Sequence, residues 1–290
     1  MNSGKMLWTL AVIVTLASAL FQRMTGPSYP IRFNEDLGGV QVKSRLLRTH
    51  SITRDLPVII QVGSPEVTGK VVWRRYPTND EWVEIPLVPG EGTPSTTLET
   101  TLPRQGMAGK VEYYVELENG DQSFRKPADE AAVARFKGDV PFVVLLIHII
   151  LMFGGMLYSS RAGFEALASG PSLAKHSLIA LCWLTVGGFI LGPIVQKYAF
   201  DAYWTGWPLG EDLTDNKLAA AVLVWVLATW RTRGAAPGRA VGRWWAVAAM
   251  LIVFVVFSIP HSLHGSTLDY ETGEHIQTSA RQVSCPITLS

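Results

Sequence analysis

The pattern of apolar and polar positions divides the chain into five apolar runs and one long segment of mixed character. A helix of about 20 apolar residues can cross the hydrocarbon core of a bilayer. We therefore expect membrane helices in the runs 6–21, 140–160, 177–196, 218–230 and 244–259. The fourth run is short, and we expect its helix to extend back through Asp215 and Asn216, with the Lys217 amine reaching the membrane interface.

The first run has two interpretations. Lys5 precedes it and Ala17-Ser18-Ala19 lies near its end, a layout typical of a secretory signal peptide. The run is also just long enough to span a bilayer if flanking residues reach the headgroups, and we favour an uncleaved signal anchor over residues 1–23. Both interpretations export the segment that follows.

Residues 24–139 have the composition of a soluble domain built from short strands. β-Branched and aromatic residues, which favour strands, are concentrated in 57–62, 69–76, 81–88 and 110–117. Pro- and Gly-rich turns separate these segments, and Asn119-Gly120-Asp121 is a hairpin signal. On the inner face we expect Val72, Trp82, Val83, Tyr113 and Tyr114. The pattern predicts an antiparallel sandwich that resembles an immunoglobulin (Ig) or fibronectin type III domain.

Trp73 and Trp82 leave two alternatives open within this sandwich. They could form an exposed binding surface, or they could pack in the core and on the sheet faces. We favour packing, because large aromatic side chains contribute strongly to protein cores.

The charges of the loops predict the direction of the helices. Loop 231–243 holds four arginines and no acid, whereas loop 198–216 holds four acids and no base. Because arginine-rich loops stay in the cytoplasm, we expect the N-terminus and loop 161–175 to be cytoplasmic as well. The sandwich, the loop 198–216 and the C-terminal tail are then extracytoplasmic.

The expected architecture is therefore a membrane α-helical bundle of five transmembrane helices plus an extracytoplasmic all-β Ig-like sandwich. Its predicted domains are a signal anchor, the sandwich, a four-helix transmembrane domain and an extracytoplasmic tail, at 1–23, 24–139, 140–262 and 263–290.

The composition agrees with a membrane protein and argues against nucleic acid as a partner. The chain is 48% hydrophobic and 17% charged, with a mean hydropathy of +0.21. Its 25 Lys and Arg nearly cancel its 24 Asp and Glu, so it lacks the basic field that nucleic-acid binding needs. Cys182 and Cys285 have no metal-ligand spacing around them, and we expect two unpaired thiols.

Three histidines fall on the extracytoplasmic side of this topology. His148 lies in the outer half of the second span, and His261 and His264 follow Pro260, where the fifth span ends. An ionisable residue inside a span suggests a functional site, because its burial in lipid is costly. Imidazoles from facing helices can ligate a haem iron, with tryptophans of a neighbouring loop covering the porphyrin.

The loop between the third and fourth spans has a sequence motif that resembles one in a known protein family. Its sequence Tyr203-Trp204-Thr205-Gly206-Trp207-Pro208, followed by Asp212-Leu213-Thr214-Asp215, resembles the tryptophan-rich loop of cytochrome c assembly and haem-handling membrane proteins. Those proteins flank the loop with outward-facing histidines, the order found here as His148, the loop, then His261 or His264. The resemblance covers about the last half of the chain, which lacks the adjacent Trp-Trp and the Trp-Asp-Pro core of that motif.

The resemblance implies that haem b is bound at the extracytoplasmic face, in a role in electron transfer or cytochrome assembly. His148 and His261 or His264 would be the iron ligands, and Trp204 and Trp207 would cover the ring. The layout is also similar to that of bacterial membrane proteins, so we expect the bacterial inner (cytoplasmic) membrane.

Each of these residues also has a structural interpretation. Trp204 and Trp207 occupy positions where interfacial aromatic belts are expected. Asp212 and Asp215 precede an apolar helix, where capping accounts for them. His148 can simply hydrogen-bond a neighbouring helix, and His176, at the cytoplasmic start of a span, is expected at the interface.

Motifs for catalysis are absent from the sequence. It contains no HExxH, GxSxG, P-loop, dinucleotide-binding glycine fingerprint or CxxCH, so an enzyme is not indicated. Two hypotheses remain. The first is a haem b protein. The second is a non-catalytic accessory subunit that contacts membrane lipid, with the sandwich docking a protein partner in a larger membrane complex.

Overall fold

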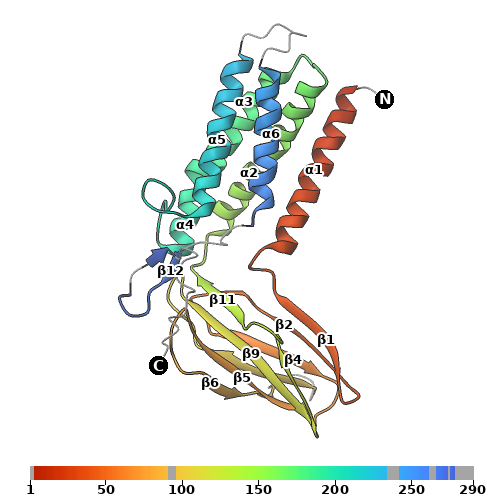
Figure 1. Ribbon diagram of the computed structural model, residues 1–290, viewed down its shortest axis with the longest axis vertical. Coiled ribbons are helices and arrows are strands. Elements are labelled where there is room, and N and C mark those ends of the chain that lie inside the picture. The colour runs from red at the N-terminus through yellow and green to blue at the C-terminus, as the bar shows by residue number, and fades with distance from the viewer. Residues whose placement is uncertain (1–2, 91–95, 234–241, 261–265, 274, 278–290) are drawn as a thin grey trace, which may run out of the picture. The chain divides into compact units, whose positions relative to one another are not determined.

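The computed structural model describes residues 3–90, 96–233, 242–260, 266–273 and 275–277, and the chain forms two units. The helical unit comprises residues 1–27, 140–265 and 277–290. The sandwich unit comprises residues 28–139 and 266–276, so it is built from two separate pieces of the chain (Figure 1).

Two sheets make up most of the sandwich unit. In the described residues the first sheet has the order β1-β2-β4-β8-β7, with strands Ile31–Leu37, Val40–Leu46, Leu56–Val62, Thr97–Leu102 and Val88–Pro89. The second has the order β3-β11-β9-β5-β6, with strands Thr49–Ser51, Ala132–Lys137, Lys110–Asn119, Thr68–Tyr76 and Val83–Pro86. A further strand, β10 (Gln122–Lys126), pairs with β9. All pairs are antiparallel except β3 with β11, so the sequence-based expectation of short paired strands is confirmed.

Turn chemistry fixes the register of the hairpins. Gln122 pairs with Asn119 across the two-residue turn at Gly120, whose φ is +59°, so the hairpin predicted there is confirmed. Gly38 and Gly39 turn β1 into β2 with φ of +63° and +83°, a conformation that side chains disfavour. The sequence contained this second signal as well, although we did not expect strands there.

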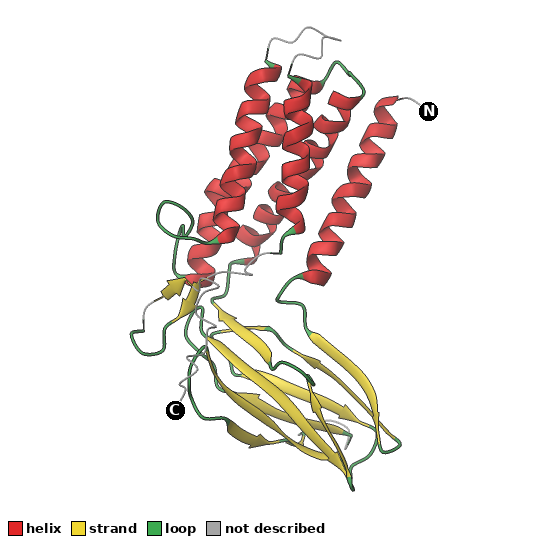
Figure 2. Ribbon diagram, viewed as in Figure 1, coloured by secondary structure: helices red, strands yellow, loops and turns green. Residues whose placement is uncertain are grey.

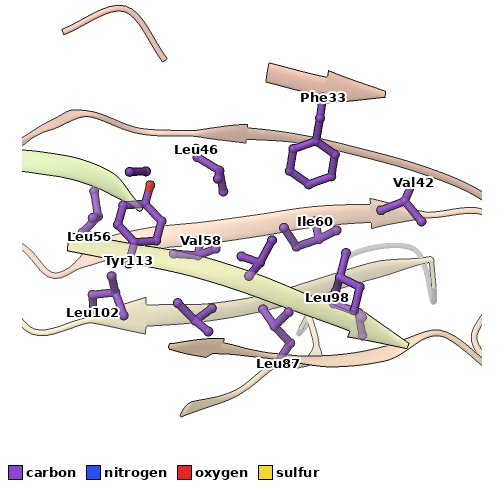
Figure 3. Packing of buried hydrophobic residues seen from close by; sticks show 14 of the residues in the cluster. Phe33, Val42, Leu46, Leu56, Val58, Ile60, Leu87, Leu98, Leu102 and Tyr113 are labelled. Carbon is purple, nitrogen blue, oxygen red and sulfur yellow. The ribbon is translucent and has the colours of Figure 1, made fainter. Parts of the chain in front are cut away.

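The core lies between the two sheets and alternates along each strand. Every second residue of β4 is buried, as is every second residue of β9 from Val111 to Leu117. Leu87, between β6 and β7, is buried at the point where the chain passes from one sheet to the other. Figure 3 shows these side chains filling the space between the sheets, including Phe33, Leu46, Ile60, Leu98, Leu102 and Tyr113.

Alternation corrects part of the predicted inner face. Tyr113 is fully buried and its hydroxyl donates to the Leu47 carbonyl at 2.8 Å. Tyr114 is its neighbour and therefore lies on the opposite, outer face, so its predicted core position is wrong. Trp82 and Val83 stand at the edge strand β6 and remain 38% and 48% exposed, so they are not core residues either.

A strap from the end of the chain completes the sandwich unit. It comprises residues 266–276 and carries the short strands β12 (Ser266–Leu268) and β13 (His275–Gln277). The Tyr270 hydroxyl donates to the Lys110 carbonyl at 2.7 Å and accepts from the Lys110 N–H at 2.9 Å. The Lys110 amine donates to the Thr267 hydroxyl at 2.6 Å. The strap thus caps the start of β9.

Helices form the other unit, as the apolar runs predicted. They are α1 (Ser3–Thr25), α2 (Phe142–Leu167), α3 (Leu173–Leu184), α4 (Gly192–Phe200), α5 (Leu213–Thr232) and α6 (Arg243–Ser258). A π-helical segment, Thr185–Leu191, joins α3 to α4 without a break. Figure 2 shows α2, α3, α5 and α6 running alongside one another as a bundle.

Three of the described helical stretches are long and apolar enough to cross a membrane: Gly4–Thr25, Phe142–Leu167 and Leu173–Phe200. Helix α6 is apolar but shorter. Helix α5, which carries Asp215, Lys217 and Arg231, is neither among the long apolar helices nor among the shorter apolar ones. Membrane association is therefore supported, while the expected five spans are supported only in part.

Lys217 lies in α5, which extends back through Asp215 and Asn216 as predicted. Its side chain is buried, and its amine donates to the Ile259 carbonyl at 2.6 Å and to the Pro260 carbonyl at 3.3 Å. These carbonyls follow the last turn of α6, where unpaired acceptors need donors. Lys217 therefore ties α5 to the end of α6, and its position at the membrane interface stays a prediction.

Candidate functional site

His148 lies in the second turn of α2 and faces the π-helical segment. Its Nδ1 is 2.9 Å from the Gly187 carbonyl oxygen. Because a carbonyl only accepts, Nδ1 carries the proton in this bond. In a neutral imidazole Nε2 is then the unprotonated nitrogen, with a lone pair free to bind a metal or accept a proton. The expected structural contact of His148 is therefore present, and it leaves the other nitrogen available.

Glycines bring the π-helical segment close enough to make this bond. A Cβ added at Gly187 would lie 2.9 Å from the Leu151 Cβ, and one added at Gly188 would overlap the Leu218 side chain. Only hydrogen atoms fit at these two positions without displacement of the neighbouring helices. The insertion of π-helical turns is a known feature of functional sites in helices.

The N-terminal third of α2, around His148, packs loosely. None of the residues from Phe142 to Ile150 is buried, whereas buried residues begin at Gly155 and continue to Ala166. His148 lies on the protein-facing side with Val144 and Leu145, and all three are only partly buried. The six large apolar side chains on the other side are 41–74% exposed: Phe142, Val143, Leu146, Ile147, Ile149 and Ile150.

Trp204 reaches the same π-helical segment from the aromatic loop, residues 198–217. Its ring stacks on Phe189 with centroids 5.4 Å apart and planes 16° apart. Its Nε1 donates to the Trp207 carbonyl at 3.2 Å. One segment thus contacts both His148, through Gly187, and Trp204, through Phe189. These two predicted site residues lie at one end of the bundle.

Trp207 is oriented differently from Trp204. Its side chain is 78% exposed, and its backbone N–H donates to the Asn216 Oδ1 at 2.6 Å. Its side chain therefore projects away from the loop, and it is not brought onto His148.

The acids of the aromatic loop hold the loop together. Asp212 caps α5 by accepting from the Thr214 N–H at 2.7 Å, as predicted. Asp215 is buried and accepts from the Thr205 N–H at 2.7 Å, so it anchors the loop backbone and is not a cap of α5. Gln196 on α4 contacts the Thr205 hydroxyl at 2.6 Å.

His261 and His264 lie outside the described residues, as does Cys285. Cys182 is an unpaired, exposed thiol. Within the part of the chain that the structure describes, no group of three or more His, Cys, Asp or Glu side chains could hold a metal ion. Of the three histidines predicted as ligands, His148 is the one that lies in the described residues.

At the other end of the bundle a buried ion pair was not predicted. Arg161 and Glu165 pair within α2 with side chains only 5% and 4% exposed. The Glu165 carboxylate also accepts from the Ser172 N–H at 2.9 Å, which closes the loop from α2 to α3. Trp8 of α1 covers the pair, with the Arg161 guanidinium 5.4 Å from its ring centre. The sequence signal was the i, i+4 spacing of two opposite charges directly after an apolar run.

His176 packs beside this ion pair, and its expected place at the membrane interface stays a prediction. It is 8% exposed, and its ring centre lies 5.7 Å from that of Trp8 and 6.2 Å from that of Tyr158. Its Nδ1 and the Arg161 Nε have no hydrogen-bond partner among the described residues.

The sandwich carries a second candidate site on the outer face of its β9 sheet. Arg74 lies 4.5 Å from the Trp82 ring centre, Trp82 lies 5.3 Å from Tyr114, and the Arg125 guanidinium lies 3.7 Å from the Tyr114 ring centre. We call these four residues the arginine–aromatic ladder. Trp73, by contrast, packs against the core. Trp73 therefore packs toward the core and Trp82 packs on the outer sheet face, while a binding role of Trp82 stays a prediction.

Comparisons of the chain with protein-family models, curated proteins and solved structures find no match.

Proposed function

We propose that this protein binds haem b at the outer end of its helical unit, with His148 as an iron ligand. The observation that carries the proposal is the hydrogen bond from Nδ1 to the Gly187 carbonyl, at 2.9 Å. Metal-binding histidines generally donate their other ring N–H to a carbonyl or carboxylate, which fixes the ring and its tautomer. Haem, when bound, would supply one-electron redox chemistry at its iron.

The surroundings of His148 suit a flat apolar group. Val144 and Leu145, which share the His148 side of α2, are apolar and only partly buried, so little packing would be lost when a porphyrin covers them. Phe189 and Trp204 supply a stacked aromatic wall along the same π-helical segment. His261 or His264 remains our proposal for a second ligand, because Pro260, which precedes them, is bound by Lys217 at the outer end of α5.

Absorption spectroscopy tests this proposal. We expect the protein purified from cells supplied with haem to give a reduced-minus-oxidised haem b spectrum, and His148→Ala to lose at least about tenfold in haem affinity. His50→Ala is the matched control, since His50 lies in β3 of the sandwich. A wild-type protein without a haem band, or an unchanged affinity in His148→Ala, would contradict the proposal.

We also propose that all five helical segments span the membrane and that the sandwich is extracytoplasmic. Helix α5 has 20 residues, which span about 30 Å, and α6 has 16, which span about 24 Å. The sandwich unit takes its two pieces from just before α2 and just after α6, so an even number of crossings between them is needed. The arginines of loop 231–243 favour its cytoplasmic side.

An Ig-like topology for the sandwich is part of this proposal. In an Ig domain one sheet has the order A-B-E-D and the other contains C, F and G. Here β2-β4-β8-β7 corresponds to the first sheet and β5-β9-β11 to the second, with β6 in the place of C′.

A second candidate function is an accessory subunit whose sandwich docks a protein partner. The arginine–aromatic ladder favours it, because Trp, Tyr and Arg dominate the binding energy of protein interfaces. We expect a partner that co-purifies in mild detergent to be lost in Trp82→Ala and in Arg125→Ala. Arg45→Ala, an exposed arginine on the other sheet, is the matched control. A stable monomer without a partner would contradict this function and leave haem binding untouched.

A further inference from the structure

The aromatic loop has an inverted polarity. Three of its large side chains point outward, with Tyr203 61%, Trp207 78% and Leu209 77% exposed. Two of its acids point inward, with Asp212 8% and Asp215 7% exposed. A loop in water normally presents polar groups to solvent and buries apolar ones. This arrangement fits a tip that is surrounded by an apolar medium.

The backbone of the loop tip satisfies its own hydrogen bonds. The N–H groups of Leu209 and Gly210 donate to the Gly206 carbonyl, each at 2.9 Å, and the Asp212 N–H donates to the Thr205 carbonyl at 2.9 Å. Pro208 has no N–H to satisfy. A segment can enter the membrane only when its backbone groups are paired within the protein. The tip from Thr205 to Asp212 meets that requirement at each of these positions.

Side chains of α5 complete this pairing and hold the tip in place. Asp215 accepts from the Thr205 N–H at 2.7 Å, and Asn216 accepts from the Trp207 N–H at 2.6 Å. A Cβ at Gly206 would lie only 2.6 Å from the Asp215 Cβ, so a glycine is needed for this approach. The loop therefore presents Trp207 and Leu209 from a fixed support.

We propose that Trp207, Pro208 and Leu209 insert into the lipid leaflet at the end of the bundle where α4 ends and α5 begins. Lipid is the occupant that the surroundings favour, because the tip is carried between two helices of the membrane domain. Lys197 lies over the Tyr203 ring at 5.4 Å, an arrangement suited to the headgroup layer. The exposed acid Asp201 lies near the start of the loop, and the exposed Glu211 lies two residues after Leu209, where the chain returns toward α5.

Fluorescence quenching of the full-length protein in phosphatidylcholine nanodiscs tests the insertion. The variants Trp207→Cys and Leu209→Cys, in a Cys182→Ser/Cys285→Ser background, are labelled with bimane. Asp121→Cys, in the exposed hairpin turn of the sandwich, is the control. We expect lipids brominated in their acyl chains to cause an about twofold loss of fluorescence at both tip positions, since interfacial segments reach the acyl boundary. At Asp121→Cys we expect quenching only by aqueous iodide.

Each other result overturns the proposal. Quenching by iodide at the tip, as at the control, would mean that the tip lies in water. Protection from both quenchers would mean that protein covers the tip. The two tip variants probe the same insertion independently, so misfolding of one leaves the other decisive. The outcome does not depend on haem, because Trp207 does not contact His148 in our proposed site.

Discussion

Two ion pairs, one in each unit, differ in how far their side chains are buried. In the helical unit Arg161 and Glu165 leave only 5% and 4% of their side chains exposed, whereas in the sandwich Lys126 and Glu35 leave 21% and 46%. A charge that remains in water loses little when its partner is removed, while a buried charge must keep its partner. The burial of an ion pair, and not the distance between its charged atoms, therefore decides how much the stability of the fold depends on it.

The largest expected effect comes from breaking the buried pair. Glu165→Ala leaves the Arg161 guanidinium buried and unpaired, and should destabilise the helical unit by about 3–5 kcal/mol. Unfolding by denaturant in nanodiscs, followed by circular dichroism, measures this loss. The double variant Arg161→Met/Glu165→Leu should lose less, because it leaves no unpaired charge. A single variant as stable as wild type would remove the contrast between the units.

A smaller loss of stability is expected when a side chain is placed against the Arg161–Glu165 pair. A Cβ at Gly170 would overlap the Glu165 carboxylate, so Gly170→Ala should cost about 1–3 kcal/mol in the same unfolding measurement. Gly192→Ala is the control, since its nearest neighbour, the Gly187 carbonyl oxygen, would be 3.8 Å away. Equal losses in both variants would show that the tight contact with Glu165 is unimportant.

The sandwich also holds a partly buried amine, that of Lys110, and a change of pH should reveal its effect on stability. Burial, with the nearby positive charge of Arg135, lowers the pKa of Lys110 to about 8. In an unfolded chain the pKa is about 10.4, so between these values the unfolded state binds more protons and stability rises with pH. The rise should be at most about 1.4 kcal/mol per pH unit, the limit for one proton.

Tyr270 should reverse this trend at higher pH. Burial raises the pKa of its hydroxyl to about 12, so above about pH 10 the unfolded state loses a proton that the folded state keeps, and stability falls. Hydrogen exchange of sandwich amides in the full-length protein measures both trends. Lys110→Met should abolish the rise and keep the fall. If stability still rises with pH in Lys110→Met, the rise comes from another titratable group.

The smallest effect is expected from the exposed pair. Lys126→Ala removes a 2.7 Å contact with Glu35, between β10 and β1, and should change stability by less than about 1 kcal/mol. The same amide exchange measurement applies. A loss as large as that of Glu165→Ala would mean that exposure does not separate the two kinds of ion pair.

Periodicity made much of the fold predictable. Apolar runs located the helices, and β-branched residues located β4, β5 and β9 to within a residue or two at most of their ends. Strands β1, β2 and β11 were not expected, because charged residues such as Arg32 and Lys43 at their outer positions lower the content of β-branched and aromatic residues on which the prediction relied. Tyr114 was assigned to the core from its residue type, although its neighbour Tyr113 already filled the inward position.

The candidate site was less predictable than the fold. The sequence identified His148 as unusual, but its hydrogen bond to Gly187 depends on a π-helical segment that no periodicity in the sequence indicates. Trp204 and Trp207 have the same residue type and lie three positions apart. Their different exposure follows from the bonds of Asp215 and Asn216 to the loop backbone, which only the folded chain reveals.

The strap at residues 266–276 has a consequence for the order of synthesis. These residues complete the sandwich, yet they leave the ribosome after every helix of the protein. In the five-span architecture that we propose, they reach the sandwich only if α6 has already crossed the membrane. Until then Lys110 lacks its contacts with Thr267 and Tyr270. In that architecture the sandwich can be completed only after α6 has been inserted into the membrane.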